Sequence, residues 1–250
     1  MDEAIRIISQ VADSTDRVIL FHSASGKDSI ALLDLMHPYF KEIVCVYMYV
    51  VKGLSHINRY LNYASNKYPN TRFVQTPHFG VYSDIKTGYM GHAKNEKQKL
   101  YSMAQITDTV REKYGIDWAF FGFKQSDSMN RRLMLRTYKD SAINEAQKKC
   151  YPLSSYKNAD VLGYIERRGL IKPERYGKGQ SAGTSISDVN YLLWLRNNFP
   201  DDLKKVISKY PMVERLLFEH DYESVETERN KDNKAVTNKP ESYKSQTAFR

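Results

Sequence analysis

Small and polar residues gather between two apolar runs in the stretch from His22 to Ser29, whose sequence is HSASGKDS. A loop that joins a buried strand to a helix leaves backbone N–H groups free for an anion, and the helix dipole adds to the attraction. Lys27 would supply a mobile positive charge. We therefore predict a phosphate site around Lys27, formed by Ser23, Ser25, Gly26, Asp28 and Ser29. The alternative is a capped helix start with an incidental lysine.

Two details refine this phosphate site. The glycine spacing of a Walker A loop is absent, which excludes that class of nucleotide loop. Asp28 could cap the helix or bind a Mg²⁺ ion that arrives with a nucleotide, because Mg²⁺ is usually held by one or two carboxylates together with phosphate oxygens.

A second charged stretch, GFKQSDSMNRR, begins at Gly122 directly after another apolar run. Lys124 and Arg131 would form a cationic rim, and Asp127 and Ser128 belong to the same turn. Arginine can bind an oxyanion through two parallel hydrogen bonds and lysine cannot, so Arg131 is the stronger candidate for charge stabilisation and Lys124 the weaker. The alternative is a solvated basic turn.

The order of apolar segments predicts an α/β fold. Runs rich in β-branched and aromatic residues indicate strands at 17–22, 42–51, 71–75 and 117–121. Helical patterns occupy 4–11, 28–36, 54–67 and 97–114, and we expect a loop over 78–91. This alternation is typical of a Rossmann-like parallel sheet with helices on both faces. Ligands of such sheets lie at the carboxyl ends of the strands, where both charged stretches begin.

We expect three parts in the chain. Residues 1–150 would form a nucleotide-binding α/β domain, and 151–221 a helical and loop extension of it, with helices at 160–168, 188–198 and 201–209. Residues 222–250 are polar and nearly free of aliphatic side chains, which predicts a flexible tail. Within the extension, the loop GKGQSAG at 177–183 would close over an acceptor substrate, the alternative being an ordinary surface loop.

Composition narrows the choice of partners. The 250 residues carry a formal net charge of +9, which suits nucleotides, pyrophosphate or nucleic acid, although a solvated basic surface is the simpler reading. No apolar run approaches the roughly 20 residues that span a bilayer, so we expect no membrane partner. With two cysteines and no secretory pattern at the N-terminus, we expect a cytoplasmic protein.

These motifs together resemble one family. The residues GKDS at 26–29 resemble the pyrophosphate loop, S-G-G-x-D-S, of the adenine nucleotide alpha-hydrolase superfamily, the PP-loop ATP pyrophosphatases. With a lysine directly before the Asp-Ser pair, this loop resembles that of phosphoadenosine phosphosulfate (PAPS) reductases and their relatives. The second stretch resembles their G-x-R-x-x-E-S-x-x-R element, with Lys124 and Asp127 as charge-conserving replacements. Residues 151–170 resemble their P-L-x-x-W-x-x-x-D-V-x-x-Y-I element. Two positions depart, since Ala24 and Ser25 stand where serine and glycine are expected.

The resemblance also implies a reaction. PAPS reductases use a cysteine thiolate near the C-terminus, but no cysteine follows Cys150 here, and Thr184 and Ser187 stand where sulfur-transfer relatives carry cysteines. The resemblance is therefore to a cysteine-poor, phage-type member without reductase activity, iron–sulfur cluster or zinc. The part of the family chemistry that the resemblance still implies uses ATP, or a related adenine nucleotide, with Mg²⁺. The nucleotide would be cleaved between the α and β phosphates to adenylylate an acceptor. In this fold the adenine would lie along the backbone of Val46, Tyr47 and Met48.

Other functions stay open at this point. The chain could be a non-catalytic module that binds an adenine nucleotide or nucleic acid, or it could resemble the small subunit of a sulfate adenylyltransferase. The acceptor would be a nucleic acid, a nucleotide or a protein, and a homo-oligomer is compatible with the sequence.

Overall fold

The computed structural model describes residues 1–174 and 185–237. The predicted closing loop at 177–183 and residues 238–250 of the predicted tail lie outside the described residues. So does Thr184.

One six-stranded sheet organises the molecule, in the order β3-β2-β1-β4-β6-β5. The parallel strands are β1 (Arg17–Phe21), β2 (Glu42–Tyr49), β3 (Thr71–Pro77), β4 (Ala119–Phe121) and β6 (Lys149–Cys150). The edge strand β5 (Ile143–Asn144) runs antiparallel to β6. The Rossmann-like parallel sheet is confirmed, and so are the four predicted strands. The sequence did not predict β5 and β6, because two residues are too few to show a period.

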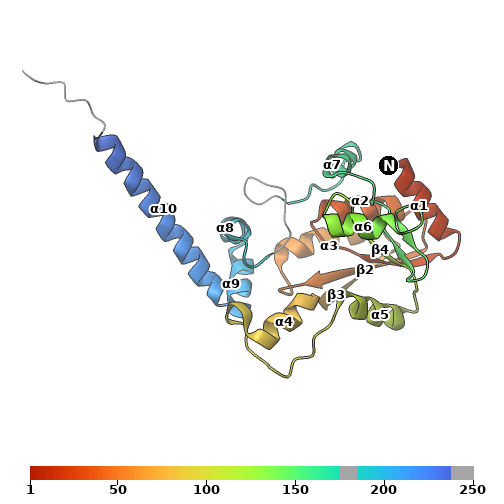
Figure 1. Ribbon diagram of the computed structural model, residues 1–250, viewed down its shortest axis with the longest axis horizontal. Coiled ribbons are helices and arrows are strands. Elements are labelled where there is room, and N and C mark those ends of the chain that lie inside the picture. Colours follow the sequence, from red (N-terminus) through yellow and green to blue (C-terminus); the bar gives the residue numbers. More distant parts are fainter. Residues whose placement is uncertain (175–184, 238–250) are drawn as a thin grey trace, which may run out of the picture.

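Helices cover both faces of this sheet (Figure 1). Their bounds are α1 (Asp2–Ala12), α2 (Lys27–Met36), α3 (Ser55–Lys67), α4 (Phe79–Thr87), α5 (Met103–Tyr114), α6 (Met129–Arg136), α7 (Asn158–Arg167), α8 (Val189–Asn198), α9 (Pro200–Lys209) and α10 (Met212–Thr237), with a 3₁₀ turn η1 (Tyr89–Gly91).

Alternate residues of each strand build two separate cores. Val18 and Leu20 of β1 pack into the larger core, which also holds apolar side chains of α1, α2, α3 and α7. Ile19 and Phe21 point to the other face, where α5 and α6 complete a smaller core. The period of two along β1 therefore buries both faces, as expected for a parallel strand.

Two local predictions were wrong. The segment expected as a loop at 78–91 contains α4, which begins where the His78 ring accepts a hydrogen bond from Gly80 N and ends at Gly88 with φ 71°. The helix expected from 97 begins only at Met103, because Ser102 and Gln105 form a reciprocal capping box there.

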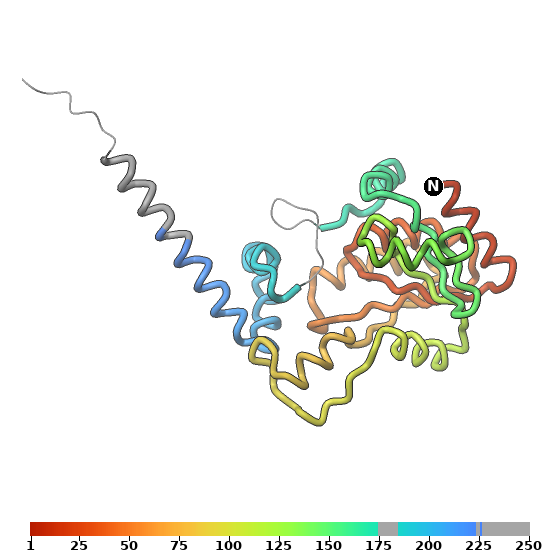
Figure 2. Tube along the Cα trace, in the orientation of Figure 1, coloured from red at the N-terminus to blue at the C-terminus, as the bar shows by residue number. Residues whose placement is uncertain are grey.

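The C-terminal helices form one end of the molecule. Helices α8 and α9 lie beside α3, and α10 leaves the body as a long projecting helix (Figures 1 and 2). The polar sequence predicts a flexible tail from 222, whereas α10 continues through these residues to Thr237. None of the helices in the described ranges is long and apolar enough to cross a bilayer.

Candidate functional site

The loop after β1 wraps tightly around the start of α2. The hydroxyl of Ser29 accepts a hydrogen bond from Ser23 N at 2.8 Å and lies 2.9 Å from the Ser23 hydroxyl. Gly26 is the N-cap of α2, and a Cβ atom there would lie 2.2 Å from Ser23 Oγ. A side chain at position 26 would displace the Ser23 hydroxyl from its contact with Ser29, so the small residues at 23–29 allow the loop to close on the helix start.

The conformation of this loop depends on a residue that the sequence analysis missed. Ala24 has φ 53°, a left-handed conformation that disfavours side chains, and its N–H donates to His22 Nδ1 at 2.9 Å. His22 is buried, which lowers its pKa to about 3, so the ring is neutral and Nδ1 is free to accept. Ser25, the other departure from the family pattern, is also buried. The signal for His22 was its position directly before the loop.

Charged residues of both predicted stretches meet in one chain of contacts. The ammonium of Lys27 lies 3.1 Å from Asp28, and that of Lys124 lies 2.7 Å from Asp28 and 3.1 Å from Asp127. Arg131 closes the chain, 2.9 Å from Asp127. The structure therefore brings the two stretches together, and Gly122 is part of the reason, since a Cβ there would lie 3.0 Å from the Asp28 Cβ.

Lys124 stands at the centre of this chain, which we call the loop cluster (Lys27, Asp28, Lys124, Asp127 and Arg131). Its side chain is 0% exposed, although the sequence analysis ranked it below Arg131. Its ammonium and Asp28 Oδ1 are close enough to form an ion pair, but neither atom has a partner with hydrogen-bond geometry. The two carboxylates therefore hold the ammonium through ion pairs, and its N–H groups are not used in well-aligned hydrogen bonds, which is rare for a buried polar atom.

The other members of the second stretch hold the rim in place. Burial raises the pKa of Asp127, but the hydrogen bond from the Lys124 backbone N–H, the charge of the Lys124 ammonium and the hydrogen bond from Arg131 outweigh it, so the pKa is lowered and the carboxylate stays charged. Ser128 caps α6 by accepting from Arg131 N at 3.2 Å. The Arg131 guanidinium stacks over Phe123 at 4.0 Å, a contact that the sequence analysis did not foresee. This stacking orients the arginine toward the loop.

Strand β2 offers backbone groups beyond the end of β1. Phe21 pairs with Val46, and His22 N donates to Val46 O at 2.9 Å. Residues two apart in a strand present their backbone groups to the same side. The N–H and C=O of Met48 therefore point past the last paired residue of β1, into the space at the carboxyl edge. Tyr47, which stands between Val46 and Met48 in the strand, has a buried side chain. An adenine edge needs one such donor and one such acceptor.

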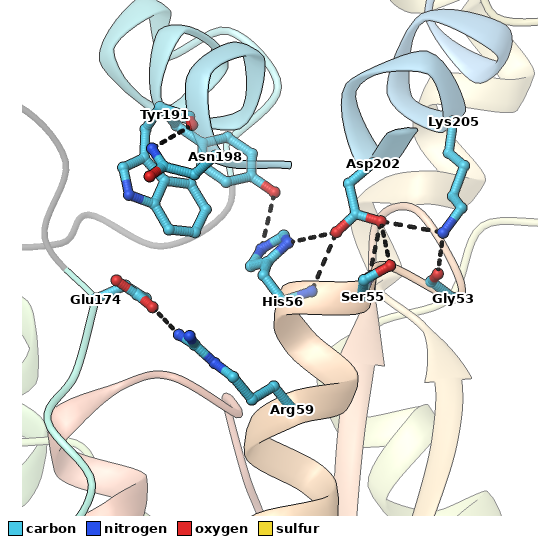
Figure 3. Close-up of polar contacts among 10 residues, drawn as sticks. Gly53, Ser55, His56, Arg59, Glu174, Tyr191, Asn198, Asp202 and Lys205 are labelled. Carbon is cyan, nitrogen blue, oxygen red and sulfur yellow. Dashed lines mark hydrogen bonds and ion pairs between the residues drawn. The ribbon is translucent and has the colours of Figure 1, made fainter. Parts of the chain in front are cut away.

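A second buried charged group lies at the same edge, where α3 begins (Figure 3). Asp202 accepts hydrogen bonds from Ser55 N at 2.8 Å, from His56 N at 3.1 Å and from Lys205 Nζ at 3.0 Å. The Asp202 carboxylate also lies 2.9 Å from the ring atom Nδ1 of His56. On the other side of this ring, the Tyr191 hydroxyl lies 3.3 Å from His56 Nε2. We call these residues the helix cluster.

The helix cluster connects the C-terminal helices to α3. Hydrogen bonds from Ser55 and His56 outweigh burial and lower the pKa of Asp202, and burial lowers the pKa of His56, so a charged carboxylate faces a neutral ring. The carboxylate caps the first turn of α3 from α9 and so ties the C-terminal helices to the sheet. Nearby, Arg59 pairs with Glu174 (Figure 3).

The residues beside the phosphate loop do not form a metal cage. Asp28 is the carboxylate that would meet a Mg²⁺ ion arriving with phosphate, and its two oxygens now contact the ammonium groups of Lys124 at 2.7 Å and Lys27 at 3.1 Å. Among the side chains that the structure describes, no group of three or more from His, Cys, Asp or Glu could hold a metal. Cys45 and Cys150 are both buried in strands, and burial raises the pKa of both thiols. The absence of an iron–sulfur cluster and of zinc stays a prediction.

Comparison with protein families now decides the relationship. The model for the phosphoadenosine phosphosulfate reductase domain matches residues 18–226. The chain belongs to this family. The match spans the sheet, both charged stretches and the first part of α10, so the resemblance inferred from the motifs is confirmed. A comparison with curated proteins gives no match.

Two solved structures are similar to this member of the PAPS reductase domain family. The U34-tRNA thiolase of Methanococcus maripaludis, with its 4Fe-4S cluster, has a TM-score of 0.43 at 17% identity over 86% of this chain and 78% of its own. The NH3-dependent NAD synthetase of Campylobacter jejuni has a TM-score of 0.45 at 12% identity over 89% and 94%. At these scores neither match bears on what this chain binds.

Proposed function

We propose that this protein binds ATP, or a related adenine nucleotide, and cleaves it between the α and β phosphates. An oxygen nucleophile of an acceptor would form a bond to the α phosphorus while the bond from that phosphorus to the bridging oxygen breaks. Pyrophosphate leaves with the bond electrons, and the acceptor loses its proton to solvent. The products are an adenylylated acceptor and pyrophosphate. The acceptor class we favour is a nucleic acid, a nucleotide or a protein.

One observation carries this proposal: the buried Lys124 ammonium that has no hydrogen-bond partner beside a loop of small residues. An ammonium held in a partly buried site attracts phosphate more strongly than one in water, because the local dielectric is lower. Its charge is balanced by Asp28 and Asp127 until phosphate arrives. Phosphate would exchange with one of these carboxylates as the partner of the ammonium.

Each member of the site has a role in the proposed reaction. Lys27, Lys124 and Arg131 would stabilise charge on the departing pyrophosphate, and the loop from Ser23 to Ser29 would surround it. Asp28 would bind Mg²⁺, which when present neutralises charge on the phosphates. The backbone of Met48 would hold the adenine. The protein would act mainly by positioning and electrostatics.

The test is to incubate the protein with ATP labelled at the α phosphate, MgCl2 and separate pools of RNA, DNA, nucleotides and protein. We expect pyrophosphate release and transfer of label to one pool. Lys27→Ala should remove the signal, whereas Lys97→Ala, which changes an exposed lysine on the segment between α4 and α5, should retain it. ATP binding without any cleavage would leave only the second function below.

A second candidate is nucleotide binding without turnover. The observation that favours it is Ala24, which stands in place of the serine of the family pattern and so removes a hydroxyl donor from the loop. The backbone of Ala24 is in the left-handed conformation. In that case ATP would bind in equilibrium and be recovered intact. An Ala24→Ser variant that gains cleavage would assign the lost turnover to this position.

A further inference from the structure

Helix α6 carries an unpartnered face beside the loop cluster. Met129 and Leu133 are 63% and 58% exposed, which is unusual for large apolar side chains. Arg132 and Arg136 are exposed on the same face, because residues at spacings of three, four and seven lie together on a helix. The opposite side of α6 is anchored by the buried Leu135.

The charge on this face is not balanced by the residues that the structure describes. Helix α6 has three arginines and no acidic residue. Arg131 pairs with Asp127, but Arg132 has no ion-pair partner among the described residues, and Arg136 makes a 3.4 Å hydrogen bond to the neutral Gln125. The face is therefore apolar and positive, a combination of methionine and arginine that is enriched at protein interfaces.

Helix α10 carries the complementary features at the other end of the molecule (Figures 1 and 2). Val213 and Leu217 anchor its start in the core. On its outer side Phe218 and Tyr222, one turn apart, are 70% and 62% exposed. A polar helix that stands clear of a core has little to stabilise it unless it finds a partner.

The first part of α10 is acidic, although Asp221 pairs with Arg196 of α8 and Glu219 pairs with Arg215. Residues 212–226 hold five acidic residues and a single basic one, Arg215. Glu214 and Glu226 continue the row of Phe218 and Tyr222 at spacings of four. Neither glutamate has an ion-pair partner in the part of the chain that the structure describes.

We propose that α10 of one copy docks on the α6 face of a second copy. Phe218 and Tyr222 would cover Met129 and Leu133, and the glutamates would pair with Arg132 and Arg136. Docking within one chain is excluded, because α10 runs away from the end of the sheet where α6 lies (Figure 1). Two copies related by a two-fold axis would make the contact twice, which brings the buried area toward that of a stable dimer.

Such a dimer would affect the loop cluster. Helix α6 follows its N-cap Ser128 and carries Arg131, so a docked α10 would cover the outer side of the helix that holds the cationic rim. The dimer itself does not rest on the proposed function, since self-association can be measured without nucleotide or turnover.

Sedimentation equilibrium of the full chain, from about 1 to 100 µM, tests the dimer. We expect the wild type to associate with a dissociation constant on the order of micromolar. The variants R132E/R136E and E214R/E226R should each weaken association by at least about tenfold, because like charges then face each other. The variant with all four substitutions restores opposite charges and should regain association to within a few-fold of wild type.

Two controls make the result specific. K86E/K97E replaces two exposed lysines and changes the net charge by the same amount as R132E/R136E. This variant should associate like wild type. Circular dichroism should show unchanged helix content in every variant. A monomer at 100 µM, or a four-fold variant that stays as weak as its parents, would overturn the proposal. A monomer whose R132E/R136E variant loses oligonucleotide binding would instead assign the α6 face to nucleic acid.

Discussion

Two buried charged groups lie at the carboxyl edge of the sheet, and they differ in how completely their polar atoms are paired. In the helix cluster, both carboxylate oxygens of Asp202 accept hydrogen bonds, from Ser55, His56 and Lys205. In the loop cluster, Lys124 Nζ and Asp28 Oδ1 lie 2.7 Å apart without hydrogen-bond geometry.

From this difference we infer a structural role for the helix cluster and propose a binding role for the loop cluster. A fully hydrogen-bonded buried carboxylate has no capacity left for a ligand, and its removal leaves N–H groups unpaired. Incompletely paired charges at the mouth of a small-residue loop keep donors and acceptors for something else. We therefore expect substitutions in the helix cluster to lower stability and substitutions in the loop cluster to lower nucleotide affinity.

The largest expected effect is on stability. Asp202→Ala should lower the free energy of unfolding by about 3–5 kcal/mol, because it strips the cap from α3 and leaves buried donors without an acceptor. Asp201→Ala is the matched control, since the neighbouring carboxylate is exposed and its ion pair among the described residues is with Lys204. Denaturant unfolding of both variants measures the difference. Equal loss in the two would contradict the structural role of the helix cluster.

The next effect concerns pH. Burial lowers the pKa of His22 to about 3, whereas the unfolded value is near 6.5. Between these values the unfolded chain binds a proton that the folded chain does not, so stability falls as pH falls. His22 should contribute about 1.4 kcal/mol per pH unit between pH 6 and 4. His22→Asn keeps an acceptor for Ala24 N and should reduce the slope by that amount in unfolding curves taken at several pH values.

The loop cluster should respond in affinity. Lys124→Met keeps the length of the side chain but removes its charge, and we expect ATP·Mg²⁺ to bind roughly 30-fold to 100-fold more weakly, since a charge-assisted contact is lost. The free energy of unfolding should fall by less than in Asp202→Ala. Isothermal titration calorimetry measures the first quantity. Unchanged affinity would place the phosphate elsewhere and remove the main support for the proposed function.

The smallest effect is expected at the rim. Arg131→Lys keeps the charge beside Asp127 but loses the planar stacking on Phe123, so ATP should bind about threefold to tenfold more weakly. Arg132→Lys, on the exposed face of α6, should leave nucleotide affinity unchanged. A larger loss from Arg131→Lys than from Lys124→Met would reverse the ranking of the two cations that burial suggests.

Local order along the chain was enough to predict the sheet, most helices and both halves of the loop cluster. The spacing of apolar residues and the turns of small residues can be recognised within a window of about ten residues. The parallel sheet then brings the carboxyl ends of its strands together. Helix α4 was missed because its start depends on the ring of His78 acting as a cap, which composition does not reveal.

Contacts between distant residues had to be seen in three dimensions. Asp202 meets His56 across 146 positions, and nothing near either residue announces the other. The sequence likewise suggested Lys124 as the weaker cation, whereas burial between two carboxylates makes it the central one. Residue type and order thus determined the fold and the family, because these depend on local patterns. The tertiary structure alone decided which buried charges are fully hydrogen-bonded and which are held by ion pairs without hydrogen-bond geometry, because pairing depends on packing.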